Sequence, residues 1–333
     1  MSESVAKSVA GHIISAWGRI LGGFQPNLSI EITRECPLRC PGCYAYGDEH
    51  LGGGVVLREL ADYKGQELVD GVIDMVRRMR PTHVSLVGGE PLVRYKELNE
   101  ILPRLSAQGL KVQVVTSAVR PIPIEWASIP DLQVCVSIDG LPAEHDVRRA
   151  PATYDRILKH IKGQQITVHC TITRQQSRPG YVTEFVEFWE KQPDVNRIWF
   201  SLYTPQVGEE SPERLLPEDR QRVVAEISSL HARFPKLRDM RPSVVQGYLQ
   251  PPSDPSACIF AQTTACFSAD MKKRITPCQF GGNPDCSQCG CMASAGLEAV
   301  GRYKVPGGLL TAGQVYWASV KFGKQVGKLR GVG

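Results

Sequence analysis

The sequence predicts an α/β fold, a partial (β/α)6 barrel of the TIM type with a small cysteine-rich C-terminal module. Short apolar, β-branched runs alternate with amphipathic stretches from residue 28 to residue 233. Such runs are typical of parallel strands joined by right-handed helical crossovers. Six of them occur, which favours a partial barrel over a closed eight-unit one. Near residue 236 the alternation stops and a segment rich in cysteine, glycine and proline begins.

The expected elements follow one another at regular spacing. The strands cover residues 28–34, 83–88, 111–117, 131–138, 166–173 and 197–203. The helices cover residues 65–79, 95–108, 154–162, 181–191 and 217–233, where apolar residues recur with the helical period. A further helical pattern over residues 4–22 ends at two glycines. We therefore expect four parts: an N-terminal helix (1–24), a barrel (25–235), a cysteine-rich module (236–300) and a basic amphipathic segment (301–333).

Composition narrows the class of protein. A net charge of +5 over 333 residues is too small to indicate a nucleic-acid partner. The sequence has no signal-type apolar core and no run of about 18 apolar residues that could span a bilayer. These features predict a cytoplasmic protein. The last segment, 301–333, leaves open a peripheral contact with the inner face of the membrane, the alternative being a helix docked on its own barrel.

Three of the eleven cysteines stand together directly after the first expected strand. Cys36, Cys40 and Cys43 have the spacing C-x3-C-x2-C, and barrel enzymes carry their chemistry where strands end. In a reducing compartment, clustered cysteines indicate metal ligands or reactive thiols. Three thiolates on a cubane iron–sulfur cluster leave the fourth iron open to a small molecule. A structural zinc ion with His50 as its fourth ligand is the alternative.

The triplet resembles the signature of the radical S-adenosylmethionine (SAM) superfamily, and the resemblance extends over roughly residues 25–205. It implies that Cys36, Cys40 and Cys43 bind a [4Fe-4S] cluster that reductively cleaves SAM to a 5′-deoxyadenosyl radical. The radical then abstracts hydrogen from, or adds to, a hydrophobic or small-metabolite substrate. A reducing partner such as flavodoxin or ferredoxin is also implied.

The same resemblance implies where SAM is contacted. The candidate residues are Tyr44, Gly88, Gly89, Glu90, Ser117, Ser137, Asp139 and Arg149. Gly88, Gly89 and Glu90 match the element that holds the methionine amino group, where glycine permits close backbone approach. Arg149 matches an arginine that pairs with the SAM carboxylate.

Six cysteines lie close together in the C-terminal part of the chain, at positions 258, 266, 278, 286, 289 and 291. Their order resembles the SPASM or twitch modules of radical SAM enzymes. This implies a second, auxiliary [4Fe-4S] cluster with Cys266, Cys278, Cys286 and Cys289 as its ligands. Cys258 and Cys291 would then be spare or substitute ligands, and a zinc knuckle is the alternative. The isolated Cys135 and Cys170 are predicted to be core residues.

The substrate class stays open at this point. The stretches NPDCSQC and AGLEAV give the chain a layout similar to that of the adenosylhopane-forming enzyme of the hopanoid pathway, which acts on a lipid. A radical SAM maturase of peptides or proteins is one alternative, and a non-enzymatic zinc or iron–sulfur protein is another. A general base or a hydrogen donor is expected among His169, Gln175, Tyr203 and Cys291.

Overall fold

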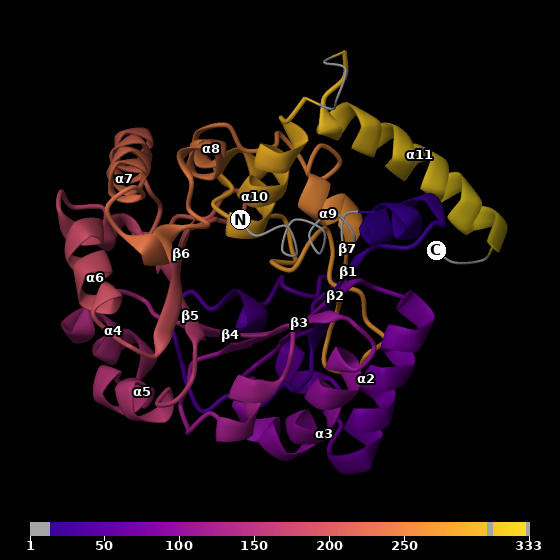
Figure 1. Cartoon of the computed structure of the whole chain (residues 1–333), viewed down its shortest axis with the longest axis horizontal. Helices are drawn as coiled ribbons and strands as arrows, with labels where there is room; N and C mark the ends of the chain where they lie inside the picture. Colours follow the sequence, from indigo (N-terminus) through magenta and orange to yellow (C-terminus); the bar gives the residue numbers. More distant parts are fainter. Residues whose placement is uncertain (1–13, 305–308, 331–333) are drawn as a thin grey trace.

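One curved, wholly parallel sheet organises the chain (Figure 1). The computed structural model describes residues 14–304 and 309–330. The strands are β1 (Asn27–Glu31), β2 (His83–Val87), β3 (Lys111–Thr116), β4 (Leu132–Ser137), β5 (Ile166–Ile172), β6 (Val195–Leu202) and β7 (Thr264–Phe267). They lie in the order β6-β5-β4-β3-β2-β1-β7. The fold class is therefore confirmed, and all of the expected strands are present.

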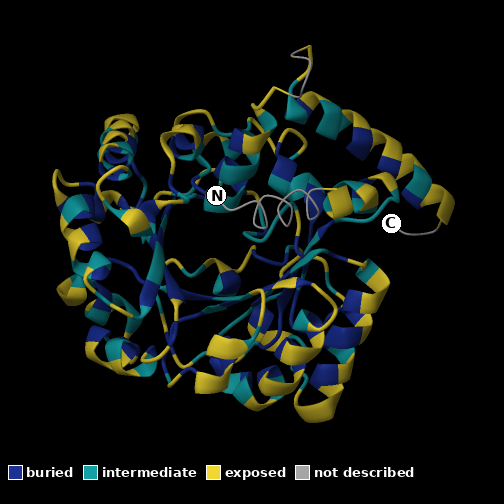
Figure 2. Cartoon of the chain, viewed as in Figure 1, coloured by how far each residue is buried: buried dark blue, intermediate teal, exposed yellow. Residues whose placement is uncertain are grey.

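Helices cover the outer face of this sheet (Figure 1). They are α2 (Gly65–Met79), α3 (Tyr95–Ser106), α4 (Pro142–Arg149), α5 (Tyr154–His160), α6 (Tyr181–Glu190) and α7 (Pro217–Leu230). In α2 the buried positions include Leu68, Val72 and Met75, which share one helical face. The short α4 differs, because its one buried residue is His145. Figure 2 shows the buried residues concentrated between helices and sheet. Cys135 and Cys170 belong to this core, as predicted.

The seventh strand comes from the cysteine-rich segment. β7 pairs in parallel with β1 and sets Cys266 beside Ser29 and Phe267 beside Ile30. The short helices α8 (Pro242–Val245) and α9 (Ile259–Thr263) precede β7. The 3-10 turn η8 (Cys286–Gln288) and the helix α10 (Met292–Gly301) follow it. The cysteine-rich segment is thus continuous with the barrel sheet, which the sequence analysis did not foresee because β7 is only four residues long.

The first and the last described segments of the chain pack on each other. Residues 14–21 are helical and lie beside α11 (Ala312–Arg330), while the rest of the expected helix, residues 4–13, falls outside the described residues. The indole of Trp17 donates to the hydroxyl of Ser319 at 2.8 Å. A Cβ on Gly23, whose φ is +87°, would lie 2.6 Å from the backbone of Gly327. The basic C-terminal helix therefore docks on its own chain.

No helix within residues 14–304 and 309–330 combines the length and apolar character needed to cross a bilayer.

Candidate functional site

The cysteine triplet lies on the loop that leaves the carboxyl end of β1. Cys36, Cys40 and Cys43 are all half-buried, and Cys43 caps the 3-10 turn η1 (Tyr44–Tyr46). Burial raises the pKa of Cys36 to about 11 and also raises that of Cys40. These thiols are therefore protonated at neutral pH, and a metal that bound them would have to displace their protons. In the described part of the chain, no three Cys, His, Asp or Glu side chains converge closely enough for a single metal ion.

Gly88 and Gly89 hold the cysteine loop against the end of β2. The Gly89 amide donates to the Thr33 carbonyl at 2.8 Å, and the Glu90 amide donates to the Glu35 carbonyl, also at 2.8 Å. Gly88 has φ +135°, and a Cβ there would lie 2.7 Å from the Thr33 carbonyl oxygen. Glycine is thus required at both positions because the backbone leading to Cys36 lies close against them. The sequence analysis had attributed these glycines to the close approach of a ligand.

The Glu90 carboxylate is an internal acceptor that fastens the end of β2 to the end of β3. It is buried, accepts from the Leu92 amide at 2.8 Å, and also accepts from the hydroxyl of Thr116. The amide and hydroxyl of Ser117 donate to its other oxygen, at 2.7 and 2.5 Å. The side chains of Glu90 and Ser117, both predicted to contact SAM, therefore hydrogen-bond to each other.

Asp139, which follows β4, lies between two arginines. Arg149 Nε donates to its carboxylate at 2.7 Å and Arg148 Nε at 3.0 Å. Burial alone would raise the pKa of Asp139, but the guanidinium groups of Arg149 and Arg148 hold it below its ordinary value. Arg148 also donates to the Pro41 carbonyl at 2.8 Å and pairs with Glu213. Arg148 thus ties the loop between Cys40 and Cys43 to the end of β4, a role that the sequence analysis missed.

The remaining candidates sit around this loop. The Tyr44 ring packs edge-on against Phe280, with centroids 5.5 Å apart, so it faces the cysteine-rich segment. Ser137 is the last residue of β4 and pairs in register with His169 on β5. His169 Nε2 lies 2.8 Å from the Ser201 hydroxyl, and burial lowers its pKa to about 4, so its ring is neutral at pH 7. Tyr203 donates to Glu209 at 2.5 Å.

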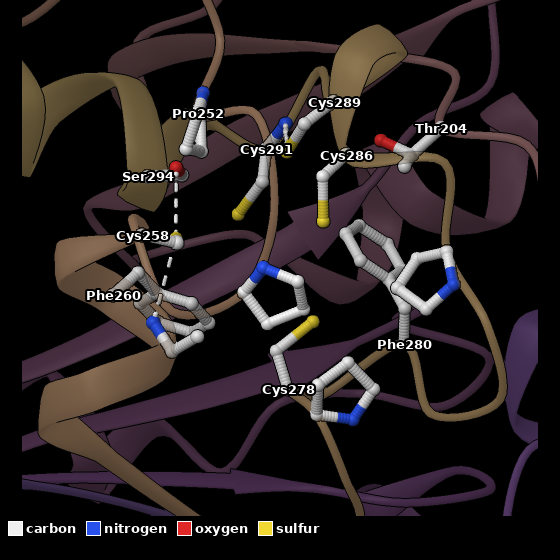
Figure 3. A pocket seen from close by; sticks show the side chains of 14 residues that line it. Thr204, Pro252, Cys258, Phe260, Cys278, Phe280, Cys286, Cys289, Cys291 and Ser294 are labelled. Atoms are coloured by element: carbon white, nitrogen blue, oxygen red, sulfur yellow. Dashed lines mark hydrogen bonds between the residues drawn. The ribbon is translucent and has the colours of Figure 1, made fainter.

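A second site lies in the cysteine-rich segment, where five cysteines line one cavity (Figure 3). They are Cys258, Cys278, Cys286, Cys289 and Cys291. Proline and phenylalanine side chains, including Pro277 and Phe280, form much of the remaining wall. In Figure 3 the sulfur of Cys286 points across the cavity toward that of Cys278. The site therefore offers soft thiol ligands in an apolar setting, a donor set that fits an iron–sulfur cluster.

Cys266 lies outside this cavity, although the resemblance assigned it as a ligand. It is buried on β7 in a small cluster with Leu51 and Ile275. Cys258 and Cys291, which the sequence analysis left over, do line the cavity. The spacing of the cysteines along the chain could not predict which of them line the cavity, because Cys266 lies on the strand β7 within the sheet.

The comparisons with known proteins agree with this arrangement of a strand, a cysteine loop and a parallel partial barrel. Residues 30–172 match the Radical SAM superfamily. Over these residues the chain is therefore similar to the radical SAM superfamily, whose members use a [4Fe-4S] cluster and SAM.

Three curated relatives illustrate the range of similarity. The mycofactocin maturase MftC of Mycobacterium tuberculosis (strain ATCC 25618 / H37Rv) is 27% identical over 139 residues, which are 40% of this chain and 33% of MftC. The PqqA peptide cyclase of Xanthomonas campestris pv. campestris (strain B100) is 27% identical over 188 residues, covering 51% of this chain and 46% of the cyclase. The 7-carboxy-7-deazaguanine synthase of Hyperthermus butylicus is 33% identical over 88 residues, covering 26% of this chain and 33% of the synthase. The chain thus spans less than half the length of each relative.

Among solved structures, Streptococcus suis SuiB bound to its precursor peptide SuiA superposes with a TM-score of 0.56. The match covers 93% of this chain and 69% of SuiB at 14% identity, so it supports the fold.

Proposed function

We propose that this chain is a radical SAM enzyme that modifies a peptide substrate. The observation that carries the peptide assignment is the match over 188 residues to a peptide cyclase, the longest of the three described above. The match to a mycofactocin maturase points to the same kind of maturation chemistry. Peptide modification was the alternative in the sequence analysis, and the comparisons favour it over the hydrophobic or small-metabolite substrate.

In this proposal Cys36, Cys40 and Cys43 bind the cluster that binds and reduces SAM. Their loop is held by the backbones of Gly89 and Glu90 on one side and by Arg148 on the other. Asp139 and Arg149 line the neighbouring strand ends, with Ser137 beside them. The bound cluster and SAM supply the radical chemistry, while these residues fix the loop and exclude water.

We propose a revised ligand set for the auxiliary cluster: Cys278, Cys286, Cys289 and Cys291. Cys291 replaces Cys266 because it lines the cavity and stands at the N-terminus of α10. Burial raises the pKa of Cys291, and the backbone N–H groups of Ser294 and Ala293 act against that rise, an effect that favours a ligating thiolate. Cys258 is the spare thiol: its sulfur contacts the Ser294 hydroxyl at 3.4 Å. A zinc ion at these cysteines is the alternative that iron analysis tests.

A small-molecule substrate is the second candidate for the whole enzyme. It is supported by the match to a 7-carboxy-7-deazaguanine synthase, whose name describes a small product. The lipid substrate suggested by the hopanoid-like layout stays a prediction, as does a flavodoxin or ferredoxin reductant.

One experiment compares these substrates directly. Anaerobically reconstituted protein is given SAM and dithionite, together with a synthetic peptide from any short reading frame beside the gene. We expect 5′-deoxyadenosine formation to rise with the peptide, and the peptide to change mass. Stimulation by polar metabolite or lipid extracts, with the peptide unchanged, contradicts peptide modification. Absence of 5′-deoxyadenosine under every condition contradicts radical SAM chemistry itself.

A further inference from the structure

Arg220 is a charged side chain that the radical SAM assignment leaves without a role. It lies in the first turn of α7 and points toward the cysteine-rich segment. Its guanidinium donates to the Gln288 carbonyl at 2.6 Å, the Cys289 carbonyl at 3.0 Å and the Tyr248 carbonyl at 2.9 Å. Arg220 therefore hydrogen-bonds to the backbone of the turn that carries Cys286 and Cys289.

The charge of Arg220 is not neutralised by a carboxylate. Its acceptors are backbone carbonyls, and within residues 14–304 and 309–330 no Asp or Glu forms an ion pair with it. Its helix neighbour Arg222 differs, because Arg222 pairs with Asp219. Asp285, the acidic residue at the start of the same turn, already accepts from Ser287 and Gln288. A half-buried cation is thus held against the backbone of the turn that carries two of the cavity's cysteines, Cys286 and Cys289.

Burial opposes this arrangement. The guanidinium of Arg220 is half-buried and therefore loses part of its hydration. Desolvating an unpaired guanidinium costs free energy that carbonyl acceptors offset only in part. An anionic group in the adjoining cavity would compensate the charge. An iron–sulfur cluster held by four thiolates is such a group, because it is anionic and becomes more so on reduction.

We propose that Arg220 raises the reduction potential of the auxiliary cluster by placing its positive charge behind the Cys286–Cys289 turn. This inference rests on the proposed auxiliary cluster. Reduction adds a negative charge, so a nearby cation in a poorly solvated site stabilises the reduced form more than the oxidised form. Arg220 is a positioning residue in this account. It acts on the cluster through its charge and through the turn that it holds.

The test is a redox titration followed by EPR. It is done on full-length protein carrying Cys36→Ala, Cys40→Ala and Cys43→Ala, so that only the auxiliary cluster gives a signal. Arg220→Gln removes the charge, Arg220→Lys keeps it without the planar fork, and Arg222→Gln is the matched control on the same helix. We expect a more negative midpoint potential in Arg220→Gln, a smaller shift in Arg220→Lys and none in Arg222→Gln.

Each other outcome has a distinct meaning. An unchanged potential in Arg220→Gln, with full iron content, overturns the inference. Loss of auxiliary iron in both Arg220 variants also overturns it, since the residue would then serve only to fold the turn. If the protein with an intact Arg220 already lacks iron at this site, the auxiliary cluster of the proposed function fails instead.

Discussion

His50 and Glu31 form a buried pair that joins the two cysteine sites. Nε2 of His50 lies 2.8 Å from Oε1 of Glu31, and the side chains are 0% and 2% exposed. Nδ1 of His50 lies 3.0 Å from the Phe280 carbonyl, two residues beyond Cys278, and the Ser268 hydroxyl donates to Glu31. Both ring nitrogens of His50 thus face acceptors, which favours the imidazolium form. Both ring nitrogens of His50 therefore already have partners. His50 is not available as the fourth ligand of a zinc ion at Cys36, Cys40 and Cys43, which was the alternative.

Replacing His50 by leucine should strongly destabilise the protein. It leaves the Glu31 carboxylate buried without its cation, and breaking such a pair typically costs about 3–5 kcal/mol. Anaerobic denaturant unfolding of the reconstituted protein measures the change. The double variant His50→Leu/Glu31→Gln should recover part of the loss, and the exposed Glu67→Gln should be neutral. A loss under about 1 kcal/mol in His50→Leu contradicts the importance of the pair.

The contribution of His50 should also depend on pH. Burial alone would lower the pKa of His50, but the hydrogen bond and charge of Glu31 raise it above its ordinary value. A group with a raised folded-state pKa stabilises fully below its unfolded pKa, about 6.5 for histidine, and loses that effect as pH rises through the folded value. The difference in unfolding free energy between wild type and His50→Leu should therefore shrink above pH 6.5. A difference that grows with pH runs against the assigned charge.

Alanine at Cys36, Cys40 or Cys43 should abolish SAM cleavage and remove about four irons from each chain. The reason is that each thiolate holds one iron of the proposed cluster. Iron and sulfide analysis with a 5′-deoxyadenosine assay measures both effects. Cys135→Ala is the control, because Cys135 is buried on β4 away from the loop. SAM cleavage at the wild-type rate in any triplet variant would falsify the assignment of that cysteine.

Cys291→Ala and Cys266→Ala should separate the two proposed ligand sets. Cys291 lines the cavity and Cys266 does not, so we expect Cys291→Ala to lose the auxiliary iron while it still cleaves SAM. Product formation should be lost in that variant. Cys266→Ala should keep about eight irons and lose only about 1 kcal/mol of stability, since it removes one buried sulfur. The opposite pattern of iron loss would restore Cys266 as a ligand.

Gly89→Ala should displace the cysteine loop. A Cβ at this position would collide with the Glu35 carbonyl and the Tyr46 hydroxyl, and the backbone there has little freedom to move. We expect the triplet cluster to fail to assemble, which iron content and the EPR signal with SAM report. Gly296→Ala is the control, since no atom lies within 4 Å of the added Cβ on α10. Normal cluster assembly in Gly89→Ala counts against the loop contact.

Much of the fold could be predicted because buried parallel strands leave long apolar runs. Strands β1 to β6 are of this kind, and each precedes an amphipathic helix or a polar loop. β7 has only four residues, Thr264–Phe267. Its cysteine was interpreted as a metal ligand, so no strand was expected there. Its place beside β1 is a long-range pairing that no local pattern encodes.

The candidate site also could be predicted only where local sequence motifs define it. The cysteine triplet and the Gly88–Gly89 pair are local motifs, so their positions at strand ends could be read from the sequence. Arg148 and Arg220 could not be assigned, because their key acceptors include the carbonyls of Pro41 and Cys289. Because every residue has a backbone carbonyl, the sequence does not show which carbonyls accept the hydrogen bonds of these arginines.

The pairing of β7 with β1 also means that the cysteine-rich segment cannot be removed as an independent domain. Deleting the chain from residue 236 onward would remove Thr264–Phe267 and uncover the hydrogen-bonding edge of β1. A strand edge without its partner is a template for pairing with another chain, so such a truncation should self-associate. Swapping C-terminal segments between relatives, as an engineer would to change substrate, must therefore carry this edge strand along.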